Sequence, residues 1–212
     1  MNIELIISFA VTSIVLALMP GPDNVFVLTE SITKGRRDGI ALSAGLSSGV
    51  IIHTALIATG LSVLIQQSEV LFLVIKIAGA CYLLFLVYQT YQSKETGMHN
   101  QTGESSNPGN PEKASFFTLF KKGFIMNVLN PKVTLFFIAF LPQFVSENGS
   151  ISFELQILLL GFIFMLTGFL VFSSIAVLAD RLSRFLTSQI FWRNVKWVKM
   201  IVLTCLALFL FI

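Results

Sequence analysis

Six long apolar stretches dominate this chain, and they constrain its fold more than any other feature. They cover residues 3–28 (interrupted), 39–65, 70–91, 123–144, 151–179 and 195–212. Hydrophobic residues make up 55% of the sequence and charged residues only 12%, whereas a soluble domain carries about a quarter charged residues. Lipid offers no hydrogen-bond partners to an open backbone, so such stretches must be helical. The pattern predicts an all-α integral membrane protein with six transmembrane helices.

The lysines and arginines sort the connecting loops into two kinds. Twelve of the 14 basic residues lie in the first, third and fifth loops, and the second and fourth loops hold none. Basic loops stay on the cytoplasmic side of a membrane, so both termini are expected to face outward. Because the basic residues lie in short loops between apolar runs, a nucleic-acid partner is rejected although the pI is about 9.0. The apolar N-terminal run has no basic start typical of a signal peptide, and we expect it to be the first span.

A polar linker divides the chain into two halves of three spans each. The linker, residues 93–115, is rich in Gly, Pro, Asn and Ser and has too few apolar residues to fold by itself. It separates a first three-helix repeat, residues 1–92, from a second, residues 116–212. An odd number of spans per half reverses the orientation of the second half, as in transporters with inverted repeats. Both halves also begin with a span that is broken at proline, MPGPDN in the first and LNPK in the second.

The break in the fourth span is the densest polar feature within the apolar runs. Asn127, Asn130, Pro131 and Lys132 fall within six residues of the stretch KKGFIMNVLNPKVTLFFIAFLPQF. Proline removes a backbone donor, and a lysine at membrane depth costs about 2.5–3.5 kcal/mol on insertion scales. A broken helix is tolerated where it lines a cavity, which favours a substrate or ion site. The alternative is a kinked helix whose Lys132 extends to the inner surface.

The break in the first span contains Asp23 and Asn24 directly after two prolines. A helix that starts there presents free amide donors, which attract an anion such as a carboxylate. Asp23 is expected either to cap these donors itself or, as a carboxylate in an apolar environment, to carry a proton. The two roles are compatible.

Three further residue types within the spans have structural as well as functional interpretations. His53 in the second span is a candidate proton relay, but we prefer a neutral histidine bonded to a neighbouring helix. Gly45 and Gly49 in the same span predict close contact with another helix. Cys81 and Cys205 are expected to be small core residues, since their spacing suits neither a disulfide framework nor a metal site.

Nothing in the sequence indicates an enzyme, a cofactor or a resident metal. The chain has no HExxH, GxSxG or P-loop motif, and its two histidines, His53 and His99, are far apart in sequence.

Several of these stretches together resemble one known family of carriers. PGPDN, the second span GIALSAGLSSGVIIHTALIATGLS, the third span KIAGACYLLFL and the fourth span FKKGFIMNVLNPKVTLFFIAFLPQF are similar to the corresponding segments of the LysE/RhtB amino-acid exporters. The resemblance implies a small carrier of the prokaryotic inner membrane that expels amino acids under the proton motive force. It covers most of the chain, and spans five and six match only in general character. Departures are Cys81 and Val87, where small residues are usual, and the long linker.

We therefore expect a secondary exporter of small amino acids or related metabolites, a multi-pass protein of the inner membrane with both termini outside. Its expected partners are the amino-acid substrate, protons, lipid and, as a homodimer, a second copy of the chain. The alternative is a non-transporting membrane subunit, or a channel, in which the charges within the spans are structural. The proton-coupling candidates are Asp23 and His53. The substrate-binding candidates are Pro20, Gly21, Pro22, Asp23, Asn24, Asn127, Asn130, Pro131 and Lys132.

Overall fold

The computed structural model describes residues 3–19, 21–61, 69–92, 115–146, 151–179, 181 and 189–209, and all of their regular structure is helical. The linker therefore lies outside the described residues, apart from Ser115. The helices are α1 (Ile3–Leu18), α2 (Pro22–Lys34), α3 (Arg36–Leu56), a π-helical turn η1 (Ile57–Leu61), α5 (Glu69–Gln92), α6 (Phe116–Val128), α7 (Pro131–Ala139), a 3₁₀ turn η3 (Leu141–Phe144), α8 (Phe153–Val177) and α10 (Gln189–Phe209).

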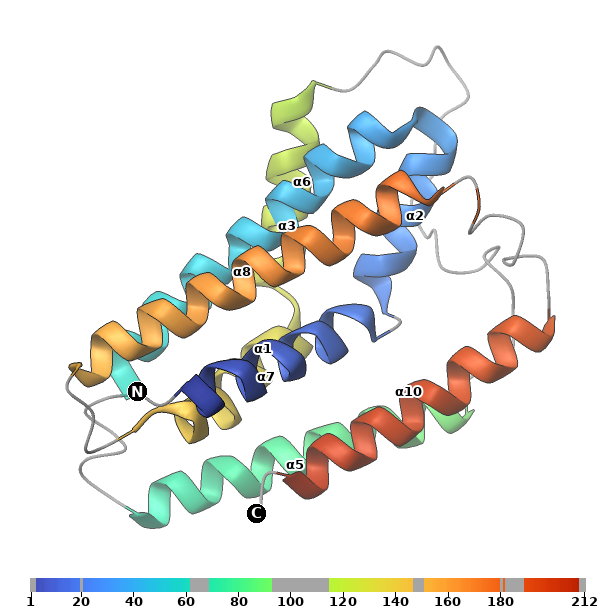
Figure 1. Cartoon of the computed structure of the whole chain (residues 1–212). Coiled ribbons are helices and arrows are strands. Elements are labelled where there is room, and N and C mark those ends of the chain that lie inside the picture. Colours follow the sequence, from blue (N-terminus) through green and yellow to red (C-terminus); the bar gives the residue numbers. More distant parts are fainter. Residues whose placement is uncertain are drawn as a thin grey trace.

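Two long helices form the centre of the molecule, and a second pair lies beside them. α3 and α8 run antiparallel in close contact, and α5 and α10 form another antiparallel pair (Figure 1). The short helices α6 and α7 pack on α3 and α5, while α1 and α2 pack on α8 and α3. The broken spans of the two halves therefore contact the long helices of both halves.

Length and composition qualify two described helices as membrane spans, and the bent pair α1–α2 makes a third if it is counted as one span. The first is α3 with its extension to Thr59, and the second is α8. The bent pair turns by 62° at its break. α6 with 13 residues and α7 with nine are each too short to cross a bilayer alone, because a span needs about 20 residues. The all-helical prediction is confirmed for the described residues, and the inverted repeat of six spans stays a prediction.

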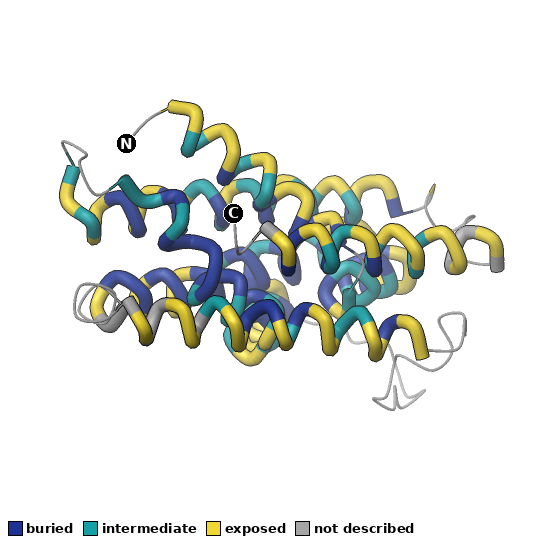
Figure 2. Tube along the Cα trace, turned by 90° about the horizontal axis from the view of Figure 1, so that it is seen from below, coloured by how far each residue is buried: buried dark blue, intermediate teal, exposed yellow. Residues whose placement is uncertain are grey.

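The outer faces of the helices are apolar, as lipid-facing surfaces are. The exposed residues of α1, α5, α8 and α10 lie on the outside of the assembly and the buried ones face inward (Figure 2). Cys81 of α5 and Cys205 of α10 are exposed on this outer surface, so the prediction that they are core residues was wrong. An apolar sequence run cannot distinguish the lipid-facing side of a helix from the buried side, because both are apolar.

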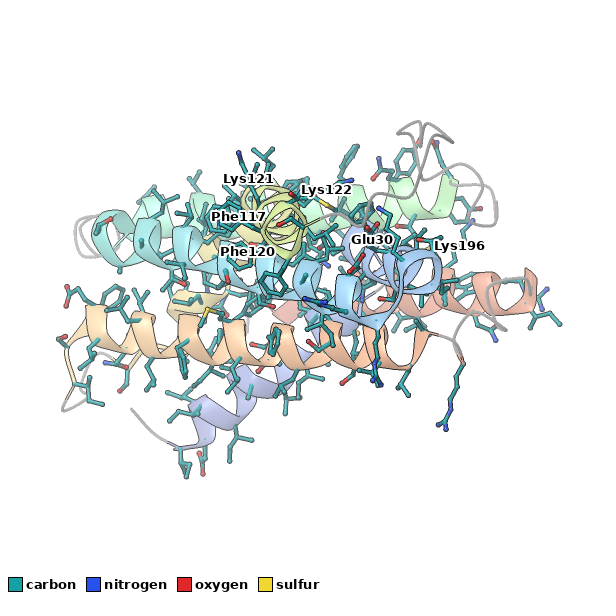
Figure 3. The ribbon with its side chains drawn as sticks, turned by 90° about the horizontal axis from the view of Figure 1, so that it is seen from above. Glu30, Phe117, Phe120, Lys121, Lys122 and Lys196 are labelled. Carbon is teal, nitrogen blue, oxygen red and sulfur yellow. The ribbon has the colours of Figure 1, made fainter. Side chains whose placement is uncertain are left out.

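The helix ends lie in two groups, at opposite ends of the bundle (Figure 1). One end of the bundle holds the starts of α1, α5 and α8 and the end of α3 (Figure 1). The other end holds the ends of α2 and α5 and the starts of α3, α6 and α10. The connection between α2 and α3 is the single residue Gly35, whose φ of 102° favours glycine. At that end, Lys122 of α6 lies 4.3 Å from the ring of Phe26 in α2, and Figure 3 shows Lys121 and Lys122 on α6 seen nearly along its axis.

Candidate functional site

The first break is built by Gly21 and Pro22. Pro22 occupies the first position of α2, where its missing N–H costs nothing. Gly21 is the N-cap residue, in an extended conformation with φ −158°, and no side chain caps the helix. Asp23 is the second residue of α2 and does not cap it, so the capping prediction was wrong. The capping side chain usually belongs to the N-cap residue. In α2 that residue is Gly21, which has no side chain.

Asn24 holds the two pieces of the first span together. Its side-chain Nδ2 donates to the carbonyl oxygen of Ala17, 2.9 Å away near the end of α1. Such a bond satisfies a carbonyl near the helix end, where intrahelical donors run out. Asn24 therefore has a structural role at the break. Pro20, which the sequence also nominated, lies outside the described residues.

The second break has the same design with a different cap. Pro131 is the first residue of α7, and Asn130 is its N-cap, accepting at Oδ1 from the backbone N–H of Lys132 at 3.0 Å. Proline cannot donate to the carbonyl four residues earlier, which belongs to Asn127. That carbonyl instead accepts from the backbone N–H of Asn130 at 2.9 Å and lies 3.2 Å from Nε2 of His53 in α3. His53 thus bonds to a neighbouring helix, as preferred from the sequence.

The two breaks meet inside the protein although they lie 107 residues apart in the chain. Asn130 donates from Nδ2 to Oδ2 of Asp23 at 2.6 Å. Lys132 Nζ lies 3.6 Å from the point that a Cβ atom on Gly21 would occupy. Asp23 and Lys132 are each the second residue of the helix that follows a break. Asn130 therefore both caps α7 and anchors the carboxylate at the start of α2.

Asp23 and Lys132 lie close enough to interact electrostatically, but the described part of the chain shows no direct ion pair between them. Asp23 is buried with 3% of its surface exposed, and Lys132 is half-buried. The ammonium of Lys132 lies beside the backbone of the first break, so the structure does not support the alternative in which it extends to the inner surface.

A small cavity lies at this junction. Its polar lining comes from Asp23, Ser47, Asn127 and Lys132, which belong to four different helices. The apolar remainder of the lining is contributed by α1, α3, α7 and α8, and it consists of Leu16, Ala17, Leu46, Val50, Val133, Phe164, Gly168 and Phe172.

Two hydrophobic clusters flank the cavity and share its wall. The larger cluster contains Phe136, Phe137 and Phe164, whose rings pack edge to face or tilted at centroid distances of 5.0–6.1 Å. The smaller cluster, at α2, α3 and α8, contains Leu46 and Phe172. Each cluster contributes lining residues, so the polar groups lie between two buried apolar regions. A low local dielectric constant strengthens electrostatic interactions.

Two buried polar atoms in the cavity wall, Ser47 Oγ and Asn127 Oδ1, have no hydrogen-bond partner among the described residues. Both residues are only 3% exposed. A buried polar atom left unpaired costs about 1–3 kcal/mol, so each calls for an explanation. A ligand in the cavity supplies one, because both atoms can accept a hydrogen bond from it.

The structure brings only part of the predicted site to the cavity. Asp23, Asn127 and Lys132 line it. Gly21, Pro22, Asn24, Asn130 and Pro131 shape the breaks, and His53 lies behind Asn127.

Sequence reasoning missed Ser47, Phe164, Gly168 and Phe172. Ser47 lies in the polar run SAGLSSG within an apolar span, which is a usable signal. The residues of α8 carry none. No group of three His, Cys, Asp or Glu side chains in the described ranges is arranged to hold a metal.

Comparison with known proteins indicates a family of membrane translocators. A sequence model described as LysE type translocator matches residues 14–212. The uncharacterized membrane protein YrhP of Bacillus subtilis strain 168 is 32% identical over 144 residues, 68% of this chain and 69% of that protein. The homoserine/homoserine lactone efflux proteins of Salmonella typhimurium strain LT2 and of Salmonella typhi are each 30% identical over 184 residues, 86% of this chain and 84% of theirs. No solved structure is significantly similar to this chain.

Proposed function

Because this chain belongs to the LysE type translocator family, we propose that it is a secondary active exporter of small amino acids and related metabolites in the prokaryotic inner membrane. Relatives named for efflux of homoserine and homoserine lactone support this class of substrate. Membership in a family of translocators also agrees with the expectation that the chain is not an enzyme. The observation that carries the proposal is the cavity at the two helix breaks, with opposite charges and unpaired polar atoms in its wall.

The polar lining complements a zwitterion. A carboxylate placed between Lys132 and the uncapped start of α2 meets an ammonium and a helix N-terminus, both of which favour an anion. An ammonium placed toward Asp23 and Asn127 Oδ1 meets a carboxylate and an acceptor that lacks a donor. The substrate then bridges the two charges that the protein itself leaves unjoined.

Coupling to protons follows from competition for one carboxylate. If Asp23 holds either a proton or the substrate's ammonium, entry of a proton from outside helps to release the substrate there. Asn130 keeps Oδ2 of Asp23 in place during the exchange. His53 is the second candidate, and it acts from behind the wall through the Asn127 carbonyl.

Symmetry between the breaks supports an inverted-repeat arrangement. Each break places proline at the first position of the following helix and a charged residue at the second. Paired broken helices of this kind form the substrate site in transporters with inverted repeats. The basic residues of the first, third and fifth loops support a cytoplasmic side for those loops and outward termini. A homodimer, expected from the small size of the carrier, completes the proposal.

The test is uptake of radiolabelled amino acids into inverted membrane vesicles with and without a proton gradient. The panel contains homoserine, threonine, alanine, leucine and lysine. Uptake that depends on the gradient for at least one compound is expected. Absence of flux for every compound at normal protein abundance supports the alternative of a non-transporting subunit, and flux without dependence on the gradient supports a channel.

A pair of double variants separates a transport role of the charges from a structural one. Asp23→Asn with Lys132→Met removes both charges from the cavity and leaves none unpaired, so the protein should accumulate but not export. Glu30→Gln with Lys34→Met is the matched control, because that pair forms an ion pair at 2.8 Å outside the cavity lining. The control should export normally. Full export by the cavity variant would refute the assignment of Asp23 and Lys132.

A further inference from the structure

Several described glycines lie where two helices touch and are required by packing. A Cβ atom on Gly45 would lie 2.0 Å from the carbonyl oxygen of Phe120, and one on Gly123 would lie 2.4 Å from that of Leu42. On Gly161 of α8 it would lie 2.3 Å from Thr54 Oγ1. These glycines let α3 approach α6 and α8 closely, and a methyl group there forces helices apart.

Gly168 of α8 differs from these glycines. A Cβ atom there would lie 3.6 Å from Ser47 Oγ and 3.9 Å from Cε2 of Phe172, both ordinary contact distances. The backbone of Gly168 is helical, so alanine fits its conformation and is the better helix former. Neither packing nor backbone geometry requires glycine at this position.

The position of Gly168 in the cavity wall offers a reason for a glycine there. Gly168 lines the cavity together with Ser47, whose buried hydroxyl has no hydrogen-bond partner in the part of the chain that the structure describes. A methyl group at Gly168 would touch that hydroxyl and the ring of Phe172 at ordinary contact distances. Because all three residues line the cavity, the methyl group would narrow it there.

We propose that Gly168 is a specificity-determining residue, whose missing side chain leaves the room in which the side chain of the exported amino acid lies. The proposal rests on the export function proposed above and adds the part of the cavity wall that limits substrate size. Gly168→Ala should leave the protein folded and should exclude the larger substrates first. A single methylene in an apolar pocket changes selection by about 10- to 200-fold.

The test is competition in inverted vesicles, with the fastest-transported member of the amino-acid panel as tracer. Alanine, 2-aminobutyrate, norvaline and norleucine are the competitors, because each is one methylene longer than the one before. In Gly168→Ala the ratio of norleucine to alanine inhibition constants should rise at least about tenfold over wild type. An unchanged ratio, or equal weakening of all four compounds at normal abundance, overturns the proposal. Wild-type vesicles that transport no panel member count against the export function instead.

Two variants control for indirect effects. Gly161→Ala changes a packing glycine two turns away on α8 and should lower thermal stability without changing the ratio in the protein that remains. Ser47→Ala in the Gly168→Ala background removes the oxygen nearest to the new methyl group and should return the ratio toward wild type. A shift of equal size in Gly161→Ala, or no recovery in the double variant, shows that the effect does not arise at this wall.

Discussion

Asn130 joins the two halves of the protein, and replacing it tests this directly. Its side chain makes two bonds with different purposes, one capping α7 through Lys132 N and one holding Asp23 Oδ2. Asn130→Ser keeps a good capping side chain but is too short to reach Asp23 as well. Asn130→Ala removes both bonds. Comparing the two variants therefore separates the cap from the link between the halves.

The magnitudes follow from the two contacts. A hydrogen bond to a charged group contributes about 1.5–3 kcal/mol, and loss of an N-cap side chain costs about 0.5–2 kcal/mol. Asn130→Ser should therefore lower the free energy of unfolding by about 1.5–3 kcal/mol, and Asn130→Ala by about 2–5 kcal/mol. Asp23→Leu removes the carboxylate that accepts the Asn130 hydrogen bond. In the Asp23→Leu variant, Asn130→Ser should therefore lower the free energy of unfolding much less than it does in the wild type.

The assay is reversible unfolding in mixed micelles, with a double-variant cycle of Asp23→Leu and Asn130→Ser. The expected coupling energy is about 1.5 kcal/mol or more, whereas independent sites add within about 0.3–0.5 kcal/mol. Thr134→Val is the matched control, because the part-buried Thr134 hydroxyl donates to the backbone carbonyl of Asn130 and not to its side chain. Additive costs of Asp23→Leu and Asn130→Ser would refute the link between the breaks.

Three further predictions test packing, linker and topology. Gly123→Ala, which places a methyl group 2.4 Å from the carbonyl oxygen of Leu42, should destabilise the protein by about 1–3 kcal/mol, as measured by the same unfolding assay; unchanged stability would contradict the close approach of α3 and α6. Deleting most of residues 97–111 should leave insertion and export nearly intact, because that segment has little apolar surface to pack; lost export at normal abundance would show that it gates transport. A reporter that is active only in the cytoplasm should stay silent when fused after Ile212, and activity there would overturn the inverted-repeat topology.

The sequence by itself determined the features that depend on local physics. Proline lacks a backbone N–H and sets its own φ, so the breaks before Pro22 and Pro131 could be located without any tertiary information. The apolar runs determined that the described chain is helical, since lipid leaves few other options. Gly45 and Gly49 indicated close helix contact for the same kind of reason, because only a missing side chain permits it.

Only the tertiary structure decided what those local features do. The partner of Asp23 is Asn130, 107 residues away, and no periodicity in the sequence encodes which residues of distant helices meet. Cys81 and Cys205 face outward because the apolar sequence looks the same on the lipid side and the buried side. In sequence, Gly168 looks like the packing glycines. It differs from them because its α-carbon faces the cavity, whereas theirs face closely packed atoms of another helix.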